Sequence, residues 1–119
     1  MYPNVPNLHH KDSRNFFLIA GTCVVESEDI TYKTAHTLQQ ITNRLGIPFI
    51  FKASYRKANR TRIDSYTGMG DERALGILSS VGKELKLPLL TDIHESHEAA
   101  IAAEYVDILQ IPAFLCRQT

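Results

Sequence analysis

This 119-residue sequence has little that would direct it to a nucleic acid, a membrane or the secretory route. Its 13 Lys and Arg residues balance 13 Asp and Glu residues, so no net charge attracts it to nucleic acid or to an anionic membrane. No apolar run approaches the roughly 18 residues of a membrane span. Residues 1–15 lack the apolar core of a secretory signal, and Cys23 and Cys116 are too few for a disulfide framework. We therefore expect a protein of the reducing cytoplasm.

Short apolar segments alternate with amphipathic ones. After a polar, irregular arm over residues 1–14, the sequence predicts strands over 16–21, 48–54, 87–93 and 106–113. Between them it predicts one helix capped by Ser27 and ended by Gly46, a second beginning at Asp71, and a short third from Ser96 to about Tyr105. This alternation is typical of right-handed crossovers and a parallel sheet, so the sequence predicts an α/β fold with strands buried on both faces.

Helical spacing also predicts which side chains face the core. In the first helix these are Ile30, Thr34, Leu38, Ile41 and Leu45. In the second they are Leu75, Leu78, Val81 and Leu85.

One segment concentrates positive charge in an otherwise neutral chain. FKASYRKANRTRIDSY, residues 51–66, carries five cations, Lys52, Arg56, Lys57, Arg60 and Arg62. Its side chains Ser54, Asn59, Thr61 and Ser65 can donate hydrogen bonds. The local charge predicts an anion site, although a solvated loop would have the same composition.

Polar residues gather where each predicted strand ends. They are Thr22, Cys23, Lys52, Ser54, Asp92, His94 and Gln110. Residues two apart in a strand share a face, and ligands of α/β folds bind at the carboxyl edge of the sheet. The joint placement therefore predicts one polar mouth above an apolar core. Taken singly, Cys23 could be a small core residue and His94 a structural histidine.

Four stretches carry a family resemblance. AGTCVVES (20–27), FKASYRKANRTRIDSYTGMG (51–70), TDIHE (91–95) and DILQIPAFLCRQT (107–119) closely resemble the first part of the 3-deoxy-D-manno-octulosonate 8-phosphate synthases. The resemblance implies a (β/α)8 barrel, usually a cytoplasmic homotetramer. Such enzymes condense phosphoenolpyruvate with D-arabinose 5-phosphate for lipopolysaccharide synthesis. The sister 3-deoxy-D-arabino-heptulosonate 7-phosphate synthases, with a KPRTSPY-like word in place of KANRTRI, are the second choice.

The resemblance also implies roles for single residues. Lys52 and Lys57 would bind phosphoenolpyruvate, and Lys57 would also approach the sugar aldehyde. Asp92 and His94 match residues of the rim, and with Lys57 they form the predicted catalytic set. The predicted substrate contacts are Lys52, Ser54, Lys57, Asn59, Arg60, Thr61, Gln110 and Arg117. Among these, Asn59, Arg60 and Thr61 would hold arabinose 5-phosphate, and Arg117 would reach the sugar phosphate of a neighbouring subunit.

Cys23 marks the metal-dependent branch of these enzymes, because the metal-independent branch has Asn at that position. The resemblance implies that His, Glu and Asp from later strands complete the site around a divalent ion. A thiolate ligand favours zinc or iron over magnesium, and manganese is a further candidate. Other positions depart from the family: Thr22 replaces a common Pro, Thr61 a Ser, YRKANR the usual FDKANR, and TGMG the usual RGPG.

A closed barrel of this kind has eight strands and roughly 250 residues. The sequence predicts four strands, so residues 15–119 are interpreted as the amino-terminal half of the synthase domain. We expect these 119 residues alone to be inactive and to bind no metal tightly. The alternative outside enzymes is an anion-binding or RNA-binding domain that uses Lys52 to Arg62. Neutral overall charge and a single ring in the cluster, Tyr55, weigh against it.

Overall fold

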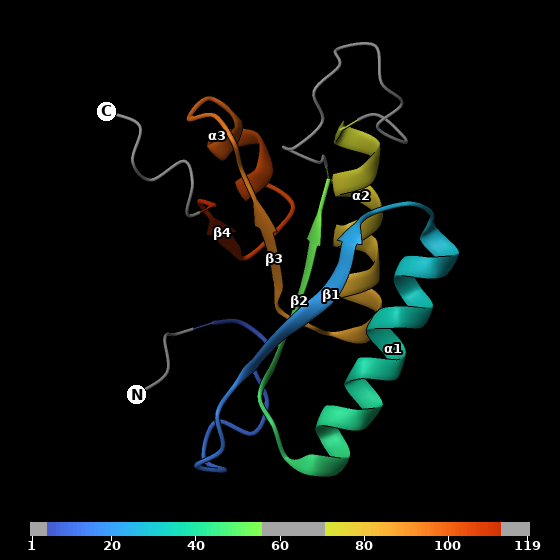
Figure 1. The fold of residues 1–119 in the computed structure, drawn as a ribbon, viewed down its shortest axis with the longest axis vertical. Helices are drawn as coiled ribbons and strands as arrows, with labels where there is room; N and C mark the ends of the chain where they lie inside the picture. The colour runs from blue at the N-terminus through green and yellow to red at the C-terminus, as the bar shows by residue number, and fades with distance from the viewer. Residues whose placement is uncertain (1–4, 56–70, 113–119) are drawn as a thin grey trace.

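The computed structural model of the chain describes residues 5–55 and 71–112. Strands and helices alternate as β1 (Leu18–Val24), α1 (Glu28–Leu45), β2 (Phe49–Ser54), α2 (Asp71–Leu85), β3 (Leu89–Asp92), α3 (Glu98–Ala103) and β4 (Ile108–Gln110). The four strands form one parallel sheet in the order β1-β2-β3-β4 (Figure 1). Sequential parallel neighbours joined by helices are the arrangement of the first part of a (β/α)8 barrel, which confirms the predicted fold class.

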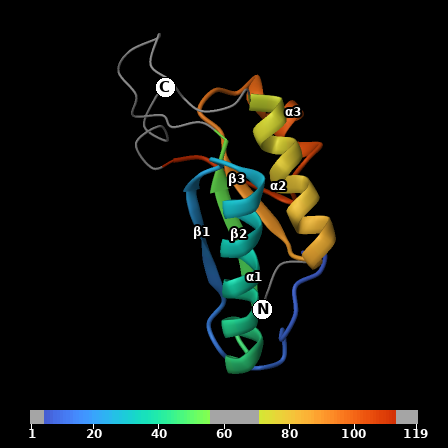
Figure 2. The ribbon, with the colours of Figure 1, turned by 90° about the vertical axis from the view of Figure 1, so that its right-hand side faces the viewer.

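The helices lie on one face of the sheet (Figure 2). The main core lies between them and the strands, and its largest fully buried side chains include Phe51 of β2 with Leu75 and Leu78 of α2. The sequence predicts that Leu75, Leu78 and Val81 of α2 face the protein core, and all three are buried. Leu85 packs against this core while remaining partly exposed.

Both predicted ends of α1 are confirmed. Ser27 adopts an extended backbone, and its side chain accepts a hydrogen bond of 3.2 Å from the Ile30 amide. Gly46 takes the left-handed conformation with φ of 67°, which glycine adopts at little steric cost.

The predicted core face of α1 is wrong at most positions. The buried residues are Thr31, Ala35 and Thr42, whereas Ile30, Ile41 and Leu45 are exposed. The threonine hydroxyls donate to carbonyls of the preceding turn, at 2.7 Å to Ser27 and 2.9 Å to Leu38, so their burial leaves no hydroxyl without a partner. Of the large apolar side chains predicted for this face, Leu38 is partly buried and packs against the core.

The second face of the sheet has its own apolar cluster. Phe49 and Phe51 belong to the helix-side core, so Ile50 between them points to the opposite face. There Ile50 and Leu90 pack with Val5 and Leu8, which come from the amino-terminal arm. The arm has turns but neither helix nor strand over residues 5–14.

Burial on both faces holds for β2 and β3 but not for β1. Along β1, partly buried and exposed residues alternate, and Ile19 retains 42% of its surface. β1 and β4 are the outer strands of the four-stranded sheet. Among the described residues, no helix is both long enough and apolar enough to cross a membrane.

Candidate functional site at the carboxyl edge of the sheet

The predicted site residues divide into two groups. Cys23, Lys52, Ser54, Asp92, His94 and Gln110 lie in the described part of the chain. Lys57, Asn59, Arg60, Thr61 and Arg117 lie outside the described residues, as do Cys116 and the other cations of the basic segment. The first group comes from the ends of all four strands, at the upper edge of the sheet in Figure 1.

Ser54 and Asp92 meet across neighbouring strands. Ser54 is the last residue of β2, Asp92 is the last residue of β3, and the two strands pair in parallel register. Ser54 Oγ donates a hydrogen bond of 2.6 Å to Asp92 Oδ1. A hydroxyl donating to an ionised carboxylate makes a strong, short bond, so this pair fixes the orientation of the carboxylate.

His94 contacts the other oxygen of the same carboxylate. Its Nε2 lies 3.0 Å from Asp92 Oδ2, and the two side chains are only 12% and 15% exposed. Because Ser54 bonds to Asp92 and not to the imidazole, the arrangement is not that of a serine nucleophile activated by histidine. It instead orients an imidazole whose Nδ1 makes no hydrogen bond to another described residue, so this nitrogen can accept or donate a proton there.

Gln110 stands beside this cluster on the next strand. It pairs in register with Asp92, and its backbone carbonyl accepts a hydrogen bond of 3.0 Å from the Ile93 amide. Strands β2, β3 and β4 therefore each end with a polar residue at neighbouring positions of one edge. The sequence prediction that these residues gather is confirmed for Ser54, Asp92, His94 and Gln110, while their chemical roles stay predictions.

Lys52 lies two residues before Ser54 on β2, in register with Gly21 of β1 and Leu90 of β3. It is partly buried, and its ammonium forms no ion pair within the described part of the chain. A Cβ at position 21 would lie 1.8 Å from the Lys52 carbonyl oxygen, so the close approach of β1 to β2 requires glycine there. A cation without a carboxylate partner is suited to hold an incoming anion.

Cys23 sits in an irregularity of the sheet. The pairing of β1 with β2 shifts between Thr22 and Val24, so that Cys23 is the extra residue of a β-bulge. Its thiol is free and exposed. Bulges at strand ends redirect side chains near functional sites. Cys23 is thus suited to be one ligand of a metal ion. The described residues hold no cluster of three or more His, Cys, Asp or Glu side chains that could bind such an ion.

Thr22, before the bulge, has a hydroxyl buried without a hydrogen-bond partner within the residues described. The chain resembles a family that commonly has Pro here, and Pro brings no hydroxyl to bury. A buried hydroxyl with no partner is unfavourable, so Thr22 is a local cost in stability.

The sequence prediction missed Glu98. A helix start was expected at Ser96, but α3 begins at Glu98, and the side chain of its N-cap residue His97 makes no capping bond. Glu98 is buried, and its carboxylate accepts hydrogen bonds from the backbone amides of His94 and Glu95 and from the Tyr55 hydroxyl. The available signal was an acidic residue four positions after the rim histidine.

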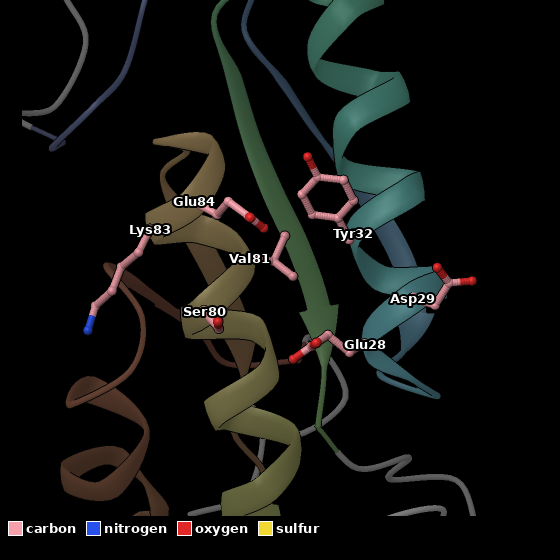
Figure 3. A pocket seen from close by; sticks show the side chains of 7 residues that line it. All are labelled: Glu28, Asp29, Tyr32, Ser80, Val81, Lys83 and Glu84. Carbon is pink, nitrogen blue, oxygen red and sulfur yellow. The ribbon is translucent and has the colours of Figure 1, made fainter.

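A hollow of the described surface lies away from this edge. It has a volume of about 690 Å³ and lies between α1 and α2, on the helical side (Figure 3). It is lined by Glu28, Asp29, Tyr32, Ser80, Val81, Lys83 and Glu84. Three carboxylates against one ammonium give it the wrong charge for a phosphorylated substrate.

Known proteins resemble the whole of the described region. The sequence model of the DAHP synthetase I family matches residues 6–119. A 2-dehydro-3-deoxyphosphooctonate aldolase of a Cyanothece species is 55% identical over 114 residues, covering 96% of this chain and 42% of the relative. Aldolases of the same name from Ralstonia pickettii and a Polaromonas species are 59% and 60% identical over 104 residues, covering 87% of this chain and 37% and 36% of the relatives. The chain thus spans about two fifths of the length of these relatives.

Proposed function

Because the chain belongs to the DAHP synthetase I family, we propose that it supplies the first four strands of a phosphoenolpyruvate-condensing synthase. The proposed reaction joins phosphoenolpyruvate, D-arabinose 5-phosphate and water to give 3-deoxy-D-manno-octulosonate 8-phosphate and phosphate, for lipopolysaccharide synthesis. The observation that carries this choice is the 55–60% identity to relatives named 2-dehydro-3-deoxyphosphooctonate aldolase. The same names favour arabinose 5-phosphate over the erythrose 4-phosphate of the sister synthases.

The charges at the carboxyl edge support this proposal. Both substrates are polyanions, and the ammonium of Lys52 has no carboxylate partner among the described residues. Lys57 and Arg60, outside those residues, would add cations from the adjoining segment. Catalysis then depends on bringing two anions together and stabilising the alkoxide that develops on the sugar.

The bond changes of the proposed reaction require proton transfers, which the cluster of Ser54, Asp92 and His94 could perform. The enol carbon of phosphoenolpyruvate attacks the aldehyde, water adds to the adjacent carbon, and the tetrahedral intermediate loses phosphate by cleavage of its carbon–oxygen bond. The alkoxide gains a proton and the attacking water loses one. His94, whose Nε2 is held by Asp92, is suited to one of these transfers.

Cys23 is the ligand that these residues would contribute to a divalent ion, with zinc, iron or manganese as candidates. Such an ion would supply Lewis-acid chemistry at the carboxyl edge of the sheet.

We further propose a cytoplasmic homotetramer in which Arg117 reaches a neighbouring subunit. Analytical ultracentrifugation of wild type and Arg117→Ala measures the oligomeric state, and isothermal titration of arabinose 5-phosphate measures binding. We expect both proteins to be tetramers, with weaker arabinose 5-phosphate binding in the variant. A monomeric wild-type protein would refute it.

The function is tested on the protein expressed from its complete reading frame. Phosphate release is measured with phosphoenolpyruvate and either arabinose 5-phosphate or erythrose 4-phosphate. We expect turnover with arabinose 5-phosphate and at least tenfold less with erythrose 4-phosphate, a ratio worth about 1.4 kcal/mol. The opposite preference would assign the chain to the sister synthases. No turnover with either sugar, together with RNA binding that falls steeply with salt, would favour the non-enzymatic alternative.

A further inference from the structure

Glu98 is a buried carboxylate for which the proposed chemistry has no use. Only 4% of its surface is exposed, although it is the first residue of a short helix. An ionised carboxylate in such a place is costly unless several donors compensate for its lost water. Its burial therefore calls for a specific explanation.

Donors from two described segments of the chain converge on this carboxylate. Oε1 accepts the backbone amides of His94 at 2.9 Å and Glu95 at 2.8 Å, and Oε2 accepts the Tyr55 hydroxyl. Hydrogen bonds to a charged acceptor are about twice as strong as neutral ones. The two amide contacts stabilise the turn between β3 and α3. The side chain of the N-cap residue His97 makes no capping hydrogen bond there.

The contact with Tyr55 extends the connection to β2. Tyr55 directly follows Ser54, is itself buried, and is the last described residue of the basic segment. The family that the sequence resembles usually has Phe in this place, as the first letter of FDKANR. Phenylalanine cannot donate a hydrogen bond, so the pair of Tyr55 and Glu98 is not part of that usual pattern.

We propose that Glu98 is a positioning residue that holds His94 in its contact with Asp92 and links it to the end of β2 through Tyr55. The inference rests on the proposed function, because His94 is taken to act on the substrates. Glu98 acts on His94 through the backbone amides of residues 94 and 95.

Kinetics and spectroscopy of three variants test the role. Glu98→Leu puts an apolar side chain in place of the carboxylate and removes both acceptors, whereas Glu98→Gln keeps a carbonyl oxygen that can accept hydrogen bonds from the two amides. We expect Glu98→Leu to lower kcat by about 10²-fold with little change in KM for phosphoenolpyruvate, because a small misplacement of a catalytic group has that effect. Glu98→Gln should restore kcat to within a few fold of wild type. Leu8→Ala, a core change in the amino-terminal arm, controls for lost stability.

Nuclear magnetic resonance separates positioning from activity. The His94 ring and amide signals should move in Glu98→Leu and return in Glu98→Gln. Tyr55→Phe should lower Tm more in the wild-type background than in Glu98→Gln, because the buried carboxylate then loses a donor. Unchanged His94 signals in Glu98→Leu, or a loss of kcat no greater than that of Leu8→Ala at equal Tm, would overturn the inference. If unmodified protein turns over neither sugar, the proposed function fails, and the His94 signals still decide the role of Glu98.

Discussion

Ser54 and Asp92 are joined by a side-chain hydrogen bond of 2.6 Å across the ends of two parallel strands. The bond leaves the second carboxylate oxygen of Asp92 to His94, at 3.0 Å. One carboxylate thus organises a hydroxyl from β2 and an imidazole from the turn after β3. The residues separated by 38 positions in sequence become parts of one cluster because parallel strands bring their carboxyl ends to the same edge.

Asp92→Asn should lower kcat strongly. Ser54 and His94 contact different oxygens of the carboxylate, and asparagine replaces one of these oxygens with an NH2 group that cannot accept a hydrogen bond. We expect kcat to fall by about 10²- to 10⁴-fold, the usual range for losing a positioned acid or base. Steady-state phosphate release measures the change, and Asp29→Asn on the exposed side of α1 is the matched control. Equal kcat in the two variants would show that the Asp92 carboxylate has no part in the reaction.

Gly21→Ala should damage both stability and substrate binding. The added Cβ would lie 1.8 Å from the Lys52 carbonyl oxygen, so β1 and β2 must separate and Lys52 must move. We expect a loss of about 1–3 kcal/mol in the free energy of unfolding, as for other overpacked sites.

Gly76→Ala is the control, because nothing lies within 4 Å of its added Cβ. In α2 that change should stabilise by about 0.5–1 kcal/mol, and urea unfolding distinguishes the two results. Gly21→Ala as stable as Gly76→Ala would contradict the close approach.

Thr22→Val should stabilise the protein, because it removes a buried hydroxyl that has no partner among the described residues. A gain of about 1 kcal/mol is expected. Thr91→Val is the opposite case, since the fully buried Thr91 hydroxyl donates to the Ala53 carbonyl at 2.8 Å. That variant should lose about 1 kcal/mol. Thermal unfolding of both compares them directly, and a lower Tm for Thr22→Val would mean that its hydroxyl is satisfied.

Cys23→Ser should weaken metal binding in the protein from the complete reading frame. Oxygen is a poorer ligand than thiolate for zinc and iron, so the purified variant should retain less metal by elemental analysis. Added chelator should inactivate it faster than the wild type. Full metal content and unchanged resistance to chelator in Cys23→Ser would remove the thiol from the proposed site.

Patterns of polarity and spacing were sufficient for the alternation of strands and helices, the caps at Ser27 and Gly46, and the gathering of Ser54, Asp92 and His94. They failed for the core face of α1, where Thr31 and Ala35 replace Ile30 and Ile41. Periodicity detects apolar side chains, but buried threonines satisfy their hydroxyls locally and give no apolar signal. The role of Glu98 was equally hidden, since an acidic residue at a helix start is usually solvated, and its partners come from segments that only the fold brings together.

The central claim is that Lys52 holds an anionic substrate at the carboxyl edge of the sheet. Isothermal titration of phosphoenolpyruvate into wild type, Lys52→Met and Lys33→Met tests it most directly. Lys33 is the control because it is 73% exposed on α1 and pairs with Asp29. We expect Lys52→Met to bind phosphoenolpyruvate at least tenfold more weakly, a loss of about 1.4 kcal/mol, while Lys33→Met binds like the wild type. Equal affinity in Lys52→Met and wild type would contradict it.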